Sequence, residues 1–206
     1  MNILVTGSNG QLGSEIKDLV ANFIDFKFFF MDLPELDICN SNQLNVFIKD
    51  NNINAVINCA AYTAVDKAEQ DADMAEKVNA TGVLNLVNAV AKINGKLIHI
   101  STDYVFDGNS FQPYNEFDEV NPIGVYGNTK RSGELAVINS DIDAIVIRTS
   151  WLYSAYGNNF VKTMLRLGKE KDELGVVFDQ VGTPTNASDL AKVCLDIIVT
   201  PKVDLC

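Results

Sequence analysis

Short apolar and β-branched runs alternate with longer segments of helical periodicity along this chain. The runs cover 2–6, 27–31, 54–59, 96–101, 143–150 and 174–179. They are almost continuously apolar, as strands of a parallel sheet are when both faces are covered. The segments between them, at 11–22, 41–51, 73–93 and 127–139, carry apolar residues at three- and four-residue spacing. This alternation predicts an α/β fold, a doubly wound, Rossmann-like parallel sheet with helices on both faces.

The same pattern predicts the buried face of one helix and the position of one long loop. In 73–93, we expect one inward helical face formed by Ala75, Val78, Gly82, Leu86, Val90 and Ile93. The segment 106–124 contains two prolines and scattered acids, and it lacks either periodicity. A loop of that length is rarely a passive connection, so we expect it to cover a binding site.

Composition and charge narrow the class of protein. The chain has 206 residues, of which 47% are hydrophobic and 21% charged, which is typical of a globular domain. A net charge of −11 argues against binding to nucleic acid or to anionic membranes. The start, "MNILVTG", does not resemble a signal peptide, so we expect a cytoplasmic protein.

The cysteines and the histidine offer little metal or redox chemistry. Cys39, Cys59, Cys194 and Cys206 show no CxxC spacing and are interpreted as free thiols in a reducing cytoplasm. His99 lies in the strand pattern "KLIHIS" and is interpreted as a core residue rather than a catalyst. A structural zinc site is not expected.

The stretch "ILVTGSNGQLGSEI" joins the first predicted strand to the first predicted helix. Its glycines Gly7, Gly10 and Gly13 form GxxGxxG, a variant of the dinucleotide-binding fingerprint. The first allows a tight turn, the second a close approach to pyrophosphate, and the third close packing of helix on strand. The helix N-terminus adds free amides and positive dipole charge. We therefore predict a dinucleotide site here, with Asn9, Gln11 and Leu12 among its contacts.

An acidic residue stands where the adenine ribose of such a cofactor is usually bound. Asp32 ends the second predicted strand, 32 − 13 = 19 residues after Gly13. A carboxylate there binds ribose hydroxyls and repels a 2′-phosphate, and the following "LPELD" has no basic residue. This favours NADH over NADPH. Asp37 and Ile38 are predicted to bracket the adenine, with an ordinary loop position as the alternative for either residue.

The fourth strand and the following helix bring candidate catalytic groups to the same edge of the sheet. Ser101 and Thr102 end that strand, and "GVYGNTKRSGE" places Tyr126 and Lys130 four residues apart. A phenol with a pKa of about 10 is a poor acid or base at neutral pH. We expect the Lys130 ammonium, together with nicotinamide charge, to bring the pKa of Tyr126 down, and Thr102 to bind a substrate carbonyl.

Taken together, these motifs resemble those of the dTDP-4-dehydrorhamnose reductases, a branch of the extended short-chain dehydrogenases/reductases. The resemblance rests on "TGSNGQLG", "NCAAYTAVDKAE", "VNATG", "STDYVFDG", "YGNTKRSGE", "RTSWLY" and "GNNFVKTMLRL". It implies reduction of the 4-keto group of dTDP-4-dehydro-L-rhamnose to dTDP-L-rhamnose by NADH or NADPH. It makes Thr102, Tyr126 and Lys130 catalytic. It places Cys59, Ala60 and Ala61 against the cofactor, and Thr63, Val65, Asp103, Tyr104 and Trp151 near the sugar.

The resemblance also has two departures. Family members typically continue into a C-terminal subdomain over the substrate nucleotide, so we expect residues 1–206 to form the NAD(P)-binding domain without it. Some members dimerise through magnesium held by glutamates. Glu15 fits the first such position, but Ser188 replaces the second, which argues against a magnesium-bridged form of any homodimer.

Two alternative functions stay open on the sequence. One is another nucleotide-sugar epimerase or dehydratase of the same class. A dehydratase generally needs Asp followed by Glu after the fourth strand, whereas here Tyr104 follows Asp103. The other is a non-catalytic regulatory subunit, such as that of methionine adenosyltransferase, because those proteins can retain the Tyr-x-x-x-Lys motif.

Overall fold

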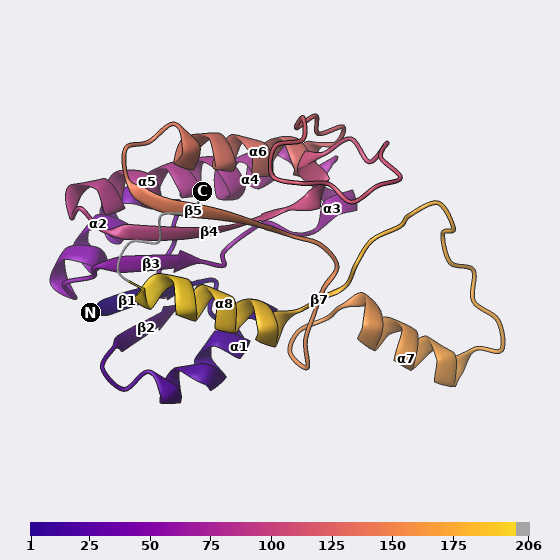
Figure 1. The fold of residues 1–206 in the computed structure, drawn as a ribbon, viewed down its shortest axis with the longest axis horizontal. Coiled ribbons are helices and arrows are strands. Elements are labelled where there is room, and N and C mark those ends of the chain that lie inside the picture. The colour runs from indigo at the N-terminus through magenta and orange to yellow at the C-terminus, as the bar shows by residue number, and fades with distance from the viewer. Residues whose placement is uncertain (201–206) are drawn as a thin grey trace.

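A computed structural model describes residues 1–200 of the chain and contains a five-stranded parallel sheet. Its strands lie in the order β2 (Lys27–Met31), β1 (Asn2–Thr6), β3 (Ala55–Asn58), β4 (Lys96–Thr102) and β5 (Asp143–Thr149) (Figure 1). The order reverses between β1 and β3, where the chain crosses to the other half of the sheet. The predicted doubly wound, Rossmann-like fold is confirmed.

Helices cover both faces of this sheet. On one face lie α1 (Gln11–Leu19), extended by η1 (Val20–Asn22), and α8 (Ala187–Val199); on the other lie α2 (Ser41–Asp50), α5 (Gly82–Lys92) and α6 (Val125–Ile138). Side chains alternate along β1, so Ile3 and Val5 pack in the core with α1 and α8 while Leu4 packs in the core with α2 and α5. Both cores hold the strand ends in fixed positions.

The predicted helix at 73–93 is one continuous helical stretch with a change of pitch. It consists of α4 (Ala72–Glu76), the π-helical turn η2 (Lys77–Thr81) and α5. Its predicted inward face is confirmed, with Ala75, Gly82, Leu86 and Val90 buried and Val78 and Ile93 half-buried. Two further short helices, α3 (Val65–Ala68) and η3 (Asp103–Val105), come after the carboxyl ends of β3 and β4.

The predicted strand at 174–179 is wrong. Residues 171–184 contain neither helix nor strand, and Phe178 is 98% exposed. The preceding helix α7 (Phe160–Glu170) has no buried residue, and it lies away from the sheet in Figure 1. The chain therefore does not return to the edge at β5, and an apolar run without a pairing edge does not form a strand. Instead β6 (Leu152–Tyr153) and β7 (Thr185–Asn186) pair as a small separate sheet.

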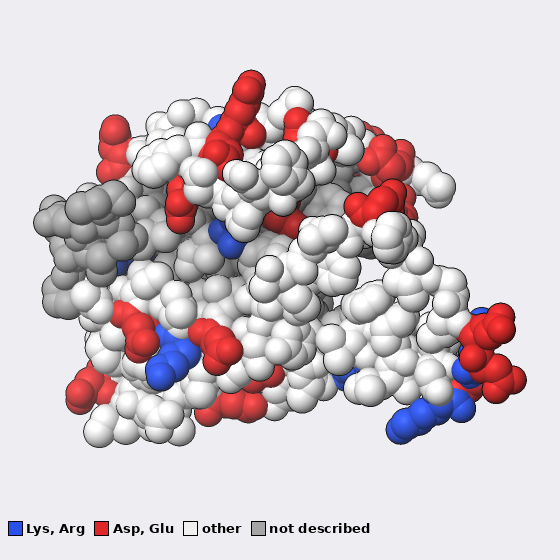
Figure 2. Space-filling model, turned by 45° about the vertical axis from the view of Figure 1, so that its right-hand side comes forward, with Lys and Arg blue, Asp and Glu red and all other residues white. Residues whose placement is uncertain are grey.

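The surface features agree in part with the sequence. The segment 106–124 is irregular beyond η3, as expected, but none of it lines the central cavity. Acidic side chains are spread over the face shown in Figure 2, in line with the net charge of −11. Cys39, Cys59 and Cys194 are free thiols, and Cys206 lies outside the described residues. Among residues 1–200, no helix is long and apolar enough to cross a membrane.

Candidate active site

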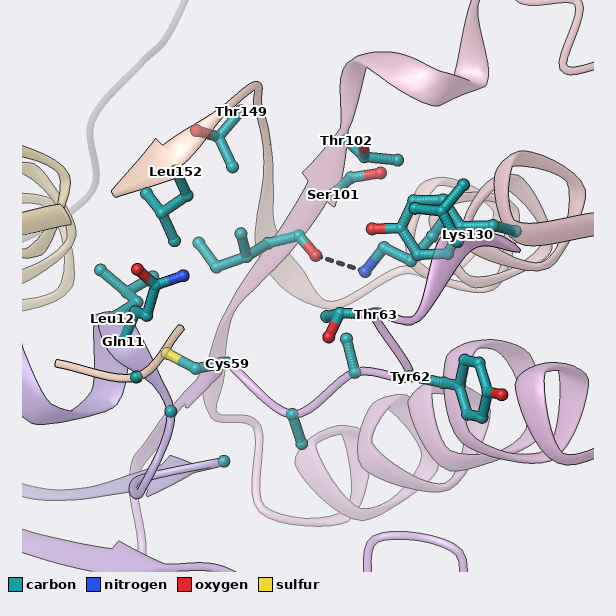
Figure 3. A pocket seen from close by; sticks show the side chains of 18 of the residues that line it. Gln11, Leu12, Cys59, Tyr62, Thr63, Ser101, Thr102, Lys130, Thr149 and Leu152 are labelled. Atoms are coloured by element: carbon teal, nitrogen blue, oxygen red, sulfur yellow. Dashed lines mark hydrogen bonds between the residues drawn. The ribbon is translucent and has the colours of Figure 1, made fainter. Parts of the chain in front are cut away.

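A cavity of about 1050 Å³ opens at the carboxyl ends of the strands. Figure 3 shows Ser101, Thr102 and Lys130 on one side of it and Cys59 and Thr63 on another. Most of the residues predicted for the cofactor and the substrate line this cavity: Gly7, Gly10, Gln11, Leu12, Asp32, Asp37, Ile38, Cys59, Ala60, Ala61, Thr63, Val65, Thr102, Asp103, Tyr104, Tyr126, Lys130 and Trp151. The two that do not, Asn9 and Gly13, shape the loop behind it.

The glycine-rich loop has the shape that a pyrophosphate requires. Gly7 has φ +63°, and a Cβ there would lie 2.5 Å from the backbone nitrogen of Ala60. A Cβ on Gly13 would lie 2.6 Å from the carbonyl oxygen of Gly7, so α1 packs directly on the turn. Gly10 caps α1 without a side chain, and the first turn of α1 has no acidic residue. This part of the cavity is therefore open to an anionic ligand on free helix amides.

Asp32 is fixed at the end of β2 by two backbone amides. Its Oδ2 accepts a hydrogen bond from the Asn9 amide at 2.9 Å and its Oδ1 accepts one from the Leu33 amide at 2.8 Å. Each carboxylate oxygen retains a lone pair, so the group can still accept from ribose hydroxyls. Asn9 thus contributes through its backbone. Among the described residues that line the cavity, Lys130 is the one basic side chain. It lies on α6, far from Asp32 in the sequence.

Lys130 is a buried ammonium with a backbone partner. Its side chain is almost fully buried on α6, and Nζ donates to the Ile100 carbonyl oxygen at 2.6 Å (Figure 3). Burial lowers the pKa of Lys130 to about 8, although the nearby Glu134 carboxylate partly opposes this by favouring the charged form. At neutral pH the ammonium is therefore charged, but it holds its proton weakly.

Tyr126 lies one helical turn before Lys130 and is also buried. Its ring packs edge-on against Tyr104, with the centroids 5.5 Å apart. Burial raises the pKa of Tyr126 to about 12, while the Thr102 side chain acts in the opposite direction. The expectation that Lys130 brings this pKa down is wrong for the described residues, because the ammonium is directed at the Ile100 carbonyl and burial dominates. The contribution of nicotinamide charge stays a prediction.

Thr102 and Asp103 form a polar pair at the end of β4. The Thr102 hydroxyl donates to Asp103 Oδ1 at 3.1 Å and accepts from the Tyr104 amide at 3.2 Å. Burial raises the pKa of Asp103. Because a hydroxyl has one proton, Thr102 must turn away from Asp103 before it can donate to a substrate carbonyl.

The predicted sugar-side residues come from three separate segments. Thr63 and Val65 follow β3, and Trp151 stands between β5 and β6 with φ +48°. The Trp151 ring meets Phe160 of α7 edge-on, with centroids 5.6 Å apart. A Cβ on Gly182 would lie 2.7 Å from Trp151 Nε1, so the irregular segment 171–184 passes directly against this indole.

Several polar residues of the site were missed by sequence reasoning. Glu134 is fully buried on α6 and accepts from Arg148 Nε and Nη2, both at 2.8 Å, and from Arg131 Nη1 at 2.8 Å. Its position four residues after Lys130 was the available signal. Thr149 was also missed: its hydroxyl lies on the cavity wall and has no hydrogen-bond partner within the described residues, whereas Ser101, expected at this edge from the sequence, also lines the cavity. A buried hydroxyl without a partner calls for a physical reason, and a bound ligand is one.

The expected magnesium position shows another contact. Glu15 Oε1 accepts from the Ser154 hydroxyl at 2.6 Å. In the described part of the chain, no group of three or more His, Cys, Asp or Glu residues is arranged to hold a metal ion.

Comparison with known sequences assigns the family. The RmlD substrate binding domain matches residues 1–204. The chain belongs to this family. The dTDP-4-dehydrorhamnose reductase of Aggregatibacter actinomycetemcomitans is 44% identical over 195 residues, which cover 95% of this chain and 66% of that protein. The chain thus spans just under two thirds of the length of this RmlD relative.

Solved structures support the same assignment. A dTDP-4-dehydrorhamnose reductase from Clostridium acetobutylicum superposes with a TM-score of 0.92 at 50% identity, covering 96% of this chain and 70% of that one. The Bacillus anthracis enzyme of the same name, solved in complex with NADP, gives a TM-score of 0.93 at 42% identity, covering 97% and 70%. The RmlD-family chain therefore has the fold of these reductases over almost all of its length.

Proposed function

We propose that this chain forms the cofactor-binding and catalytic part of an enzyme that reduces dTDP-4-dehydro-L-rhamnose to dTDP-L-rhamnose with NADH or NADPH. The observation that carries the proposal is the convergence of Thr102, Tyr126 and Lys130 on the cavity that the glycine-rich loop also lines. Relatives at 40–44% identity bear the name dTDP-4-dehydrorhamnose reductase, and one structural neighbour contains NADP.

The reduced nicotinamide supplies hydride to the carbonyl carbon when it is bound. The loop amides around Gly10 and Gln11 bind the pyrophosphate, and Asp32 binds the adenine ribose. Tyr126 is protonated at neutral pH because its pKa is raised to about 12, so it can give a proton to the developing alkoxide. Lys130 offers its ammonium to the nicotinamide ribose, close to Tyr126.

The remaining wall suits a polar sugar. Thr102 and Asp103 offer a hydroxyl and a carboxyl beside Tyr126, while Thr63, Val65 and Trp151 offer mixed polar and apolar surface. Simple ketone reduction needs one proton donor, and Tyr126 provides it. Because Tyr104 follows Asp103, the chain lacks the second carboxyl that a dehydratase uses at that point. These features support a reductase over a dehydratase.

We also propose that NADH binds more tightly than NADPH. Asp32 lines the cavity, its neighbours Leu33 and Leu36 are apolar, and the described residues that line this end of the cavity include no basic group to neutralise a 2′-phosphate. The NADP bound to the Bacillus anthracis relative makes this preference worth testing directly. Cytoplasmic localisation and a homodimer stay predictions of the sequence.

The test is an assay of the purified full-length gene product with each cofactor. Addition of dTDP-4-dehydro-L-rhamnose should cause loss of NADH absorbance, and dTDP-L-rhamnose should appear in equal amount. A protein that binds NADH but never oxidises it with this sugar would instead fit the regulatory-subunit alternative. Conversion of dTDP-glucose without net NADH consumption would fit a dehydratase.

A further inference from the structure

Three polar side chains form a buried row across the centre of the sheet. Thr6, Asn58 and His99 are register partners on the neighbouring strands β1, β3 and β4. Asn58 Oδ1 accepts from the Thr6 hydroxyl at 2.7 Å, and Asn58 Nδ2 lies 3.0 Å from His99 Nδ1. All three are almost completely buried. Buried polar groups in a sheet core weaken hydrophobic packing, so their presence calls for a physical reason.

His99 fixes the orientation of the Asn58 amide. The amide nitrogen of asparagine can only donate, so His99 Nδ1 must accept and the ring proton must lie on Nε2. Burial holds the pKa of His99 well below its usual value, so the ring is neutral and Nδ1 keeps its lone pair. With its nitrogen directed at His99, the amide presents its oxygen to β1 and to the segment after β3.

That oxygen lies where the two loops of the cofactor site touch. Asn58 Oδ1 also accepts from the Ala60 amide at 3.2 Å, and the Cys59 amide donates to the Thr6 carbonyl at 3.1 Å. A Cβ on Gly7 would lie 2.5 Å from the Ala60 nitrogen, so the glycine turn and Ala60 are in direct contact. Asn58 Oδ1 therefore accepts hydrogen bonds from Thr6, which precedes Gly7, and from Ala60, which Gly7 contacts.

We propose that Asn58, oriented by His99, is a positioning residue that holds the glycine-rich loop and the 59–61 segment in the mutual arrangement needed to bind a dinucleotide. Both loops line the cavity, whereas neither Asn58 nor His99 does. Asn58 therefore acts through Thr6 and Ala60 and does not contact the ligand. This inference rests on the proposed nicotinamide cofactor, but the coupling of the two loops is a property of the protein alone.

Two substitutions of Asn58 separate positioning from simple stability. Asn58→Leu keeps the number and branching of the side-chain heavy atoms, although its methyl groups are larger, and it removes the acceptor of the Thr6 hydroxyl and the Ala60 amide. Asn58→Asp keeps an acceptor for both donors. Its second oxygen can accept from His99 once the ring proton moves to Nδ1, and this change breaks no hydrogen bond because Nε2 has no partner within the described residues. Ile48→Val, on the buried face of α2 and away from the cavity, is the control for lowered stability.

The first measurement is NADH affinity by fluorescence titration. Asn58→Leu should raise the NADH Kd by about tenfold or more, the scale of a buried donor left unsatisfied. Asn58→Asp should stay within roughly threefold of the unmodified protein, and Ile48→Val should leave the Kd unchanged. An unchanged Kd in folded Asn58→Leu, or an equal loss in Asn58→Asp, would overturn the positioning role.

The second measurement, hydrogen exchange without ligand, does not depend on the cofactor. In Asn58→Leu, amides in 7–12 and in 59–62 should exchange faster together, while in Ile48→Val they should not. Faster exchange in only one of the two segments would contradict the coupling. If the unmodified protein binds neither NADH nor NADPH, the proposed function fails, and the exchange result still decides whether Asn58 couples the loops.

Discussion

Replacing Lys130 by methionine should make the protein more stable while it removes function. Lys130 is 2% exposed, and within residues 1–200 its ammonium has one hydrogen-bond partner, the Ile100 carbonyl. Burying a charge with so little compensation opposes folding. Methionine has similar length, no charge and adaptable packing, so it fills the same space without that cost. A lysine kept at a destabilising position is expected where its charge serves binding or catalysis.

The size of the effect follows from the pKa of Lys130. Burial lowers it from 10.5 to about 8, and a difference of roughly 2.5 units at about 1.36 kcal/mol each corresponds to about 3 kcal/mol. Between these two pKa values the unfolded chain binds more protons than the folded one, so stability rises with pH through this window. Below about pH 8 the full cost is present. Allowing about 1 kcal/mol for the lost hydrogen bond, Lys130→Met should gain roughly 2 kcal/mol at neutral pH.

Urea denaturation at neutral pH and near pH 10.5 measures this directly. The gain should be present at neutral pH and largely gone at the higher pH, where Lys130 is neutral in the folded protein and about half neutral in the unfolded chain. At neutral pH, a chain of this size should show a rise in Tm of about 2–4 °C for each kcal/mol. Lys67→Met is the matched control, because the Lys67 side chain is 70% exposed and its removal should change little.

Two results would refute this reasoning. A loss of stability in Lys130→Met at neutral pH would mean that Glu134 and the Ile100 carbonyl outweigh the cost of burial. A gain that is the same at both pH values would show that packing, and not the charge, is responsible. NADH titration of the same variant should show weaker binding, and unchanged binding would remove Lys130 from the cofactor site.

Three further substitutions test other parts of the site. Tyr126→Phe should lower kcat by about 10²-fold or more because the proton donor is lost, while NADH affinity stays nearly intact; near-normal turnover would exclude Tyr126 as the acid. Glu134→Gln should cost about 1.5–3 kcal/mol in urea denaturation, because the amide keeps an acceptor oxygen for Arg148 but loses the negative charge that pairs with it. Burial acts to raise the pKa of Glu134, but Arg148 and other donors bind the carboxylate and the net shift is downward. The ionised carboxylate therefore stabilises the fold, and the unmodified protein should lose that stability as pH falls through the lowered pKa. Asp32→Ala should narrow or reverse the preference for NADH over NADPH in parallel titrations, and tighter NADPH binding by the unmodified protein would contradict the reading of Asp32.

The sequence predicted the elements whose burial follows from local periodicity. The runs at 2–6 and 27–31 are strands with the predicted bounds, and the helical face through Leu86 and Val90 is buried. The run at 174–179 has the same apolar, β-branched character but no strand edge beside it. Local composition indicates what a segment prefers, whereas a strand also needs a neighbour, and that depends on where α7 directs the chain.

Motifs in the site were easier to predict than contacts between strands. Gly7, Thr102 and Tyr126 follow strands or begin helices, so their place at the cavity could be inferred from order alone. Asn58 and His99 are 41 residues apart in sequence and meet only because β3 and β4 pair in one particular register. Nothing in a single sequence specifies that register, so the buried polar row of Thr6, Asn58 and His99 could not be predicted.

The protonation of Tyr126 and Lys130 could not be inferred from their spacing either. Spacing indicates that the two groups are near each other, which suggested that the ammonium lowers the pKa of the phenol. Burial disfavours both ions, so the pKa of Tyr126 rises to about 12 and that of Lys130 falls to about 8. The result is a phenol that keeps its proton until an alkoxide needs it, beside an ammonium that holds its own proton weakly. A protonated phenol is the form that can donate to an alkoxide, and its pKa depends on how deeply α6 is packed against β4, which no local motif encodes.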